Sequence, residues 1–125
     1  MAERPVKAPT AEHPISIAPT AGRVVVRVNG DVVADSRSAL TLQESTYPAV
    51  QYIPLSDVNQ QLLRRTQTVT YCPYKGEAGY FSVAGEHVVV DDAVWFYPQP
   101  YPAVAAIAEH VAFYPDKAQI TISPE

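Results

Sequence analysis

Apolar and polar residues alternate along much of this chain in short stretches, and residues that favour turns separate the stretches. Alternation with a period of two is typical of a β-strand that buries one face. The pattern predicts strands at residues 15–17, 24–28, 32–34, 39–44, 50–53, 68–72, 78–83, 87–90, 93–97, 111–114 and 119–122. The chain is therefore expected to be mainly β.

The clearest local signal is the Asn29-Gly30 dipeptide between two valine-rich strands. Both residue types tolerate the positive φ angles of a two-residue hairpin turn. We expect the strands at residues 24–28 and 32–34 to form an antiparallel hairpin.

Two short helices are predicted between the strands. Ser56 offers an N-cap oxygen for a helix over residues 57–65, with Asp57 in its first turn. Pro102 suits the first turn of a second helix, which is expected to run to about residue 109.

These elements predict one domain over residues 15–125, built from coiled, barrel-like antiparallel sheets with the two short helices. Residues 1–14 contain three prolines and almost no large apolar side chains. Such a segment buries too little apolar surface to fold, so we expect it to be a flexible leader.

Composition narrows the class of protein. Of the 125 residues, 47% are hydrophobic and 18% are charged, as in ordinary globular domains. The net charge of −4 argues against nucleic acid or an anionic membrane as partner, because both attract basic surfaces. No window approaches the ~18 apolar residues of a membrane span, and the N-terminus does not resemble a signal peptide, so a cytoplasmic location is expected. The single cysteine excludes an internal disulfide and a four-cysteine zinc site, and no metal or cofactor is indicated.

Candidate chemistry gathers between Tyr71 and Tyr80, where Cys72 and Lys75 lie at a turn before Gly76. Alternation in the neighbouring strands separates two sets of side chains. One set is apolar or aromatic and is expected in the core: Val69, Tyr71, Phe81, Val83, Val94 and Phe96. The other set combines hydroxyls, a thiol and large rings: Thr70, Cys72, Tyr80, Ser82, Trp95 and Tyr97. If these strands are neighbours, the second set forms the wall of a small-ligand pocket with Lys75 at its rim.

Cys72 and Lys75 are the candidate catalytic residues, and each has a second interpretation. Cys72 is a nucleophile if Lys75 favours its thiolate, or otherwise a small buried side chain. Lys75 binds a phosphate or carboxylate, or acts as a Schiff-base or acid–base group, or otherwise is a solvated turn residue. The three histidines, His13, His87 and His110, lie far from Cys72 in the sequence, so no general base is expected beside it.

Further side chains extend the candidate ligand site. Glu44 ends a predicted strand and could pair with Lys75 across the site. Four rings form either an aromatic cage for a ligand ring or cation, or simple core and rim packing: Tyr74, Tyr80, Trp95 and Tyr97. Asp91 and Asp92 are adjacent, and adjacent strand residues point to opposite faces, so a turn is expected there rather than a metal site.

Several separate blocks of the sequence occur in the same order in a known family. They include Val33-Ala34-Asp35-Ser36, Tyr52-Ile53-Pro54, the segment from Cys72 to Tyr80, the strand around Trp95, and Phe113-Tyr114. On these blocks the chain resembles the small bacterial and fungal proteins catalogued as Domain of Unknown Function 427, which is sometimes labelled nucleotidyltransferase-like. The resemblance implies a mainly-β domain similar to the β-tent architecture of Mss-four-like proteins.

Two departures limit what this resemblance implies for chemistry. The β-tent relatives typically hold zinc with two Cys-x-x-Cys pairs, whereas this chain has one cysteine, so zinc is not implied. Nucleotidyltransferases present a Gly-Ser turn and paired carboxylates for two metal ions, and neither Gly-Ser nor Asp-x-Asp occurs in this sequence. The residues therefore give nucleotidyl transfer no support.

Three classes of function remain open. The favoured expectation is a domain that binds a small anionic or heterocyclic metabolite in one aromatic and polar pocket. The first alternative is an enzyme that uses Cys72 or Lys75 on a small substrate. The second is a protein-interaction module or homodimer that uses the strip of prolines and tyrosines at residues 97–101.

Overall fold

The computed structural model describes residues 4–124 and confirms a mainly-β protein. Residues 4–124 contain ten strands, all paired antiparallel. These strands are β1 (Ile15–Pro19), β2 (Arg23–Val28), β3 (Asp31–Ser36), β4 (Leu40–Glu44), β5 (Val50–Pro54), β6 (Leu63–Cys72), β7 (Gly76–Ala84), β8 (Val89–Phe96), β9 (His110–Phe113) and β10 (Gln119–Ser123). No helix within these residues is long and apolar enough to cross a bilayer.

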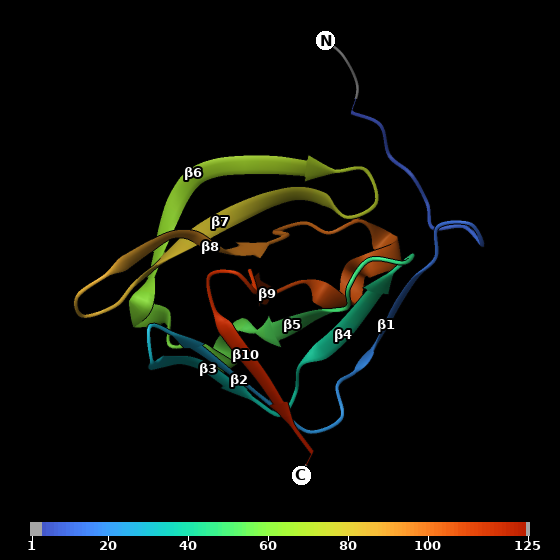
Figure 1. Ribbon diagram of the computed structural model, residues 1–125. Coiled ribbons are helices and arrows are strands. Elements are labelled where there is room, and N and C mark those ends of the chain that lie inside the picture. Colours follow the sequence, from blue (N-terminus) through green and yellow to red (C-terminus); the bar gives the residue numbers. More distant parts are fainter. Residues whose placement is uncertain (1–3, 125) are drawn as a thin grey trace.

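The strands form two sheets (Figure 1). The larger sheet has the order β1-β4-β5-β9-β8-β7-β6, and the smaller has the order β10-β2-β3. Within residues 4–124 the larger sheet stays open at β1 and β6, so the antiparallel sheets are not closed into a barrel. Pro19 stands at the end of β1, where its missing N–H prevents a further ladder bond and suits an edge strand.

The predicted hairpin at Asn29-Gly30 is confirmed as β2 and β3. Asn29 has φ 50° and Gly30 has φ 86°, so both central residues adopt the positive φ that a type I′ turn requires. This hairpin forms most of the smaller sheet.

The predicted helix over residues 57–65 is wrong. Two short 3-10 turns, η1 (Leu55–Asp57) and η2 (Gln60–Leu62), stand there, and β6 begins at Leu63. Val58 between the turns is extended and bridges to Ala34 of β3, so sheet pairing replaces the helical bonds. Ser56 caps no helix, and the Asp57 carboxylate accepts a hydrogen bond from Ser36 at 2.6 Å.

The second predicted helix is a 3-10 segment, η3 (Pro102–Ile107), with Pro102 in its first turn as expected. The backbone is non-helical at Val104, with φ −124° and ψ 26°. Val104 and Ile107 are fully buried, and 3-10 geometry places residues three apart on one side. Burial of these two side chains therefore outweighs the helix propensity of the alanines around them.

The turn expected at Asp91 and Asp92 is also wrong, because β8 continues through both residues. Asp92 has φ 47° and lies where the register between β7 and β8 shifts, which marks a bulge. Its carboxylate accepts hydrogen bonds from Thr66 Oγ1 at 2.7 Å and Thr68 Oγ1 at 2.6 Å. The bonds from Thr68 and Thr66 hold the pKa of Asp92 below its ordinary value.

The larger sheet buries side chains on both faces, and two cores result. One face packs against the smaller sheet in a cluster that we call the valine core: Val24, Val26, Val28, Val33, Ala34, Ala39, Ile53, Val58, Val83, Ala93, Val94, Val111, Phe113 and Ala118. The other face carries a second cluster that we call the tyrosine cluster: Leu42, Tyr52, Ala78, Tyr80, Tyr97, Val104, Ile107 and Ala112. Neighbouring residues such as Tyr52 and Ile53 belong to different cores, because a strand alternates its side chains between the faces.

The predicted division of side chains between the faces holds for β7 and β8 but fails for part of β6. Phe81, Val83, Val94 and Phe96 pack in or against the valine core as expected. Val69 is 50% exposed, and Tyr71 is half-buried outside both clusters. β6 is an edge strand with a register shift between Arg65 and Val69, so its alternation does not follow that of β7.

The segment predicted as a flexible leader is described from residue 4 onward, and residues 1–3 lie outside the described residues. Residues 4–14 form no helix or strand but run along the β6–β7 turn. Lys7 N donates to Pro73 O at 2.9 Å, and Tyr71 Oη donates to Pro5 O at 2.6 Å. This path places His13 next to Glu44, one of the candidate site residues.

Candidate functional site

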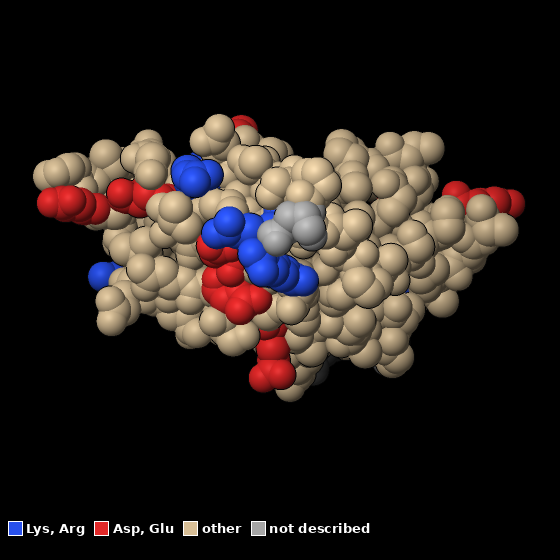
Figure 2. Space-filling model, turned by 90° about the horizontal axis from the view of Figure 1, so that it is seen from below, with Lys and Arg blue, Asp and Glu red and all other residues tan. Residues whose placement is uncertain are grey.

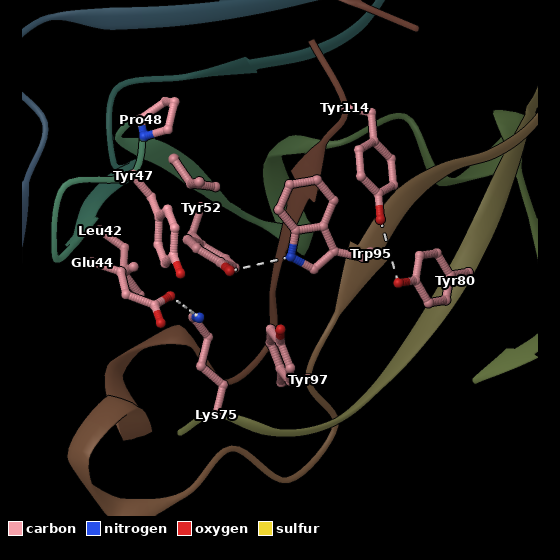
Figure 3. A pocket seen from close by; sticks show the side chains of 11 residues that line it. Leu42, Glu44, Tyr47, Pro48, Tyr52, Lys75, Tyr80, Trp95, Tyr97 and Tyr114 are labelled. Atoms are coloured by element: carbon pink, nitrogen blue, oxygen red, sulfur yellow. Dashed lines mark hydrogen bonds and ion pairs between the residues drawn. The ribbon is translucent and has the colours of Figure 1, made fainter. Parts of the chain in front are cut away.

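A cavity of about 190 Å³ opens beside the tyrosine cluster. β4 and β5 contribute one wall, β7 and β8 contribute another, and the β6–β7 turn brings Lys75 to its edge (Figure 3). The two walls are joined through β9, which forms only two residue pairs with β5 and two with β8. This short junction lets the two halves of the sheet diverge, and the space between them is the cavity.

Aromatic side chains dominate the wall of the cavity. Five of the eight tyrosines in the chain line it together with the single tryptophan: Tyr47, Tyr52, Tyr80, Tyr97, Tyr114 and Trp95. Leu42, Pro48 and Val50 supply its apolar part. Tyr80 and Trp95 are paired across β7 and β8, so their rings share one face as the sequence predicted.

The hydroxyls of the wall form short hydrogen-bonded chains. Trp95 Nε1 donates to Tyr52 Oη at 3.2 Å, and Tyr114 Oη donates to Tyr80 Oη at 3.3 Å. Burial raises the pKa of Tyr52, Tyr97 and Tyr114 above the ordinary value for tyrosine. These hydroxyls therefore keep their protons at neutral pH and can both donate and accept hydrogen bonds.

Lys75 and Glu44 form an ion pair at the edge of the cavity, as the sequence suggested. Lys75 Nζ donates to Glu44 Oε1, and the two side chains are only 9% and 14% exposed. The other carboxylate oxygen, Glu44 Oε2, lies 2.7 Å from His13 Nε2. Burial opposes ionisation of Glu44, but the hydrogen bonds from Lys75 and His13 outweigh it and lower the pKa of Glu44.

Cys72 lies next to this ion pair. Lys75 Nζ is 3.7 Å from Cys72 Sγ, and the half-buried thiol packs against the tyrosine cluster. His13, which is distant in the sequence, reaches this region through its hydrogen bond to Glu44. The structure thus assembles a chain of polar groups that runs from His13 through Glu44 and Lys75 to Cys72.

The structure brings most of the sequence-predicted site residues together and separates one of them. Glu44, Lys75, Tyr80, Trp95 and Tyr97 line the cavity. Tyr74 instead stacks on His13 outside the cavity lining, with ring centroids 4.1 Å apart and planes 7° apart.

The two tyrosine rings of the strip at residues 97–101 are at least partly buried. Tyr97 is 8% exposed and faces the cavity. Tyr101 is half-buried, and its hydroxyl lies 2.6 Å from Tyr71 Oη. These two rings therefore offer little exposed aromatic surface, and the interaction expected of the strip stays a prediction.

Sequence reasoning missed four side chains of this region. Tyr52 and Tyr114 each adjoin a residue of the valine core, and strict alternation could have placed them on the opposite face. Tyr47 lies in the loop after β4 and His13 lies before β1, where no periodicity applies. No local signal could have found these two.

The face of the smaller sheet carries exposed charges of both signs, unlike the cavity with its largely buried ion pair. Figure 2 shows the face of the smaller sheet, where basic and acidic side chains adjoin in a mixed patch. Arg23 and Asp35 form a bidentate pair there, with Nε to Oδ1 at 2.7 Å and Nη2 to Oδ2 at 2.5 Å. Among residues 4–124, no group of three or more His, Cys, Asp and Glu side chains is arranged to hold a metal ion.

Comparison with known proteins identifies the family. A family model described as a domain of unknown function, DUF427, matches residues 16–123 of this chain. The chain therefore belongs to the DUF427 family, in agreement with the resemblance of its sequence blocks. No curated protein matched the sequence.

Proposed function

We propose that the cavity binds a small heterocyclic molecule. The observation that carries the proposal is the convergence of five tyrosines and Trp95 on one space. Flat aromatic walls stack well on a planar ring, and the hydroxyls can pair with the polar edge of that ring. The volume of about 190 Å³ is below the ~300 Å³ that marks the lower end of drug-sized sites, so the ligand is small.

The charge of the site favours a neutral ligand over an anion. Lys75 is the only lysine or arginine that lines the cavity among the described residues, and Glu44 already pairs with it. An anion would have to displace the carboxylate or share the ammonium with it, and either arrangement leaves a charge poorly compensated. Of the two ligand classes that the sequence suggested, the heterocyclic class therefore fits better.

A thermal-shift screen tests this function. The panel contains neutral purines, pyrimidines and cyclic amides, and for comparison sugar phosphates and carboxylates. A ligand at about 100 times its Kd should stabilise the fold by roughly 2.7 kcal/mol, which is several degrees for a domain of this size. We expect shifts from the neutral heterocycles.

A matched pair of variants ties any shift to the cavity. Tyr47 is 57% exposed at the edge of the cavity, so Tyr47→Ala should leave the fold intact and weaken binding. Tyr101→Ala removes a tyrosine outside the cavity and should retain binding. Equal loss in both variants, or no shift from any neutral heterocycle, argues against the proposal, and shifts from anions alone would restore the anionic class.

A further inference from the structure

We propose that Lys75 forms a reversible imine with a neutral aldehyde or ketone bound in the cavity. This inference rests on the proposed function, because the carbonyl compound must first occupy the same space. It assigns Lys75 as the nucleophile and Glu44 as its proton acceptor.

The backbone fixes Lys75 at the edge of the cavity. Lys75 N donates to Cys72 O at 3.2 Å, and Tyr101 N donates to Lys75 O at 3.0 Å. Gly76 follows with φ 115°, in the region that favours glycine, and the Lys75 side chain points to the edge of the cavity (Figure 3). A lysine that is held in this way, with its side chain 9% exposed, differs from an ordinary turn lysine, which extends into solvent.

Glu44 is placed to take the proton that the reaction requires. Only the neutral amine can attack a carbonyl carbon, and Glu44 Oε1 is already hydrogen-bonded to Lys75 Nζ. His13 Nε2 holds the second oxygen at 2.7 Å, which orients the carboxylate. Lys75, Glu44 and His13 thus supply a nucleophile, a proton acceptor and a group that positions the acceptor.

The step balances within these groups. The Lys75 ammonium gives a proton to Glu44, and the amine nitrogen then forms a bond to the carbonyl carbon while the π electrons move to oxygen. That oxygen takes the proton from Glu44, and the nitrogen loses its second proton to the hydroxyl as water departs. The products are a protonated imine on Lys75 and one water, with Glu44 again ionised.

Charge conservation selects a neutral carbonyl compound. The protonated imine keeps the positive charge of the ammonium, so the ion pair with Glu44 persists and the buried carboxylate stays compensated. In Figure 3 the hydroxyls of Tyr47, Tyr52 and Tyr97 point toward the same space as the end of Lys75. They can donate a hydrogen bond to the carbonyl oxygen as negative charge develops on it.

Competition among the lysines of the chain tests the proposal without any substitution. The sequence contains Lys7, Lys75 and Lys117, and the first and last are exposed. The full chain is incubated at neutral pH with pyridine-3-carboxaldehyde, a neutral heterocyclic aldehyde, and sodium cyanoborohydride, which reduces an imine to a stable secondary amine. Peptide mass spectrometry then measures modification at each lysine.

We expect Lys75 to be modified at least about tenfold faster than Lys7 or Lys117, because the cavity holds the aldehyde against the amine. A lysine that is merely buried reacts more slowly than exposed ones, so the proposal and simple packing predict opposite orders. Modification of Lys75 at the rate of the exposed lysines, or below it, overturns the proposal.

Two variants assign the roles of the neighbouring groups. Glu44→Gln removes the proton acceptor and should slow modification of Lys75 about tenfold, while Lys7 and Lys117 react as before. Glu77→Gln is the matched control: this carboxylate is 53% exposed, pairs with Arg4 and lies outside the cavity lining, so the same change there should leave the rate at Lys75 unchanged. An unchanged rate at Lys75 in folded Glu44→Gln removes Glu44 from the mechanism and overturns the assignment, and the wild-type competition decides the nucleophile if that variant does not fold.

The failure of this inference is distinguishable from failure of the proposed function. A neutral heterocycle without a carbonyl group tests binding alone in the thermal-shift assay. Binding of that heterocycle without preferential modification of Lys75 rejects the imine and retains the binding function. If the heterocycle does not bind and Lys75 is not preferentially modified, both the binding function and the imine are rejected.

Discussion

The two faces of the larger sheet bury side chains of different character. The valine core contains aliphatic side chains, alanines and one phenylalanine, whereas the tyrosine cluster contains three buried tyrosines and borders a cavity. The two cores share strands, since β5, β7 and β9 contribute buried side chains to each. The valine core therefore holds the two sheets together, whereas the tyrosine cluster borders the space that we propose as the ligand site.

The difference follows from what covers each face. The smaller sheet lies across the valine core and closes it (Figure 1), so aliphatic side chains can interdigitate without polar partners. The opposite face is folded toward itself across the short strand β9, and the gap that remains borders hydroxyls, the indole N–H and an ion pair. Polar groups remain there because they have partners or reach the cavity.

The largest expected effect comes from a truncation in the valine core. Ile53 is 1% exposed on β5, and Ile53→Ala should lower the free energy of unfolding by about 2–5 kcal/mol through lost burial and a new void. Urea unfolding followed by circular dichroism measures the change. If Ile53→Ala lowers the free energy of unfolding by less than Lys75→Met does, the division between the two cores is contradicted.

A smaller effect is expected from breaking the ion pair at the cavity. Lys75→Met leaves the Glu44 carboxylate half-buried beside an apolar side chain and should cost about 1–3 kcal/mol of unfolding free energy. The double variant Lys75→Met/Glu44→Leu removes both charges and should recover most of that loss. If the double variant is as unstable as the single one, packing rather than charge explains the effect.

The two cores should also differ in their response to acid. The folded-state pKa of Glu44 lies below its ordinary value of 4.5, so its contribution to stability is complete above that pH and is lost as pH falls through the folded-state pKa. Lys75→Met removes the hydrogen bond from Lys75 that lowers this pKa. The difference in unfolding free energy between wild type and Lys75→Met should therefore shrink as the pH falls. Unfolding experiments between neutral and acidic pH measure this convergence, and Ile53→Ala should show a constant difference across the same range.

The smallest effect on stability is expected at Tyr97. Tyr97 lines the cavity, and Tyr97→Phe keeps its ring and removes only the hydroxyl, so the free energy of unfolding should change by less than about 0.5 kcal/mol. The same change should weaken the response to heterocyclic ligands, because one donor and acceptor is lost. A large loss of stability with unaltered ligand response would place Tyr97 with the structural core instead.

Local patterns predicted the strands well and the helices poorly. Alternation located β2 to β5, β7 and β10 within a few residues, and Asn29-Gly30 specified its turn because both residues must adopt positive φ. The segment from residue 57 to 65 fits helical spacing, but Val58 pairs with Ala34 of a distant strand. Long-range pairing outweighed a weak local preference there.

Local patterns likewise predicted only part of the candidate site. Alternation along each strand was enough to separate Tyr80 from Val83 and to separate Trp95 and Tyr97 from Val94, because it depends on neighbouring residues alone, and the pairing of Tyr80 with Trp95 then joined the two sets. The meeting of His13, Glu44 and Lys75 depends on tertiary structure, since each lies 31 positions along the chain from the next. Contacts at such distances depend on the order of strands in the sheet, and periodicity along the chain carries no information about that order.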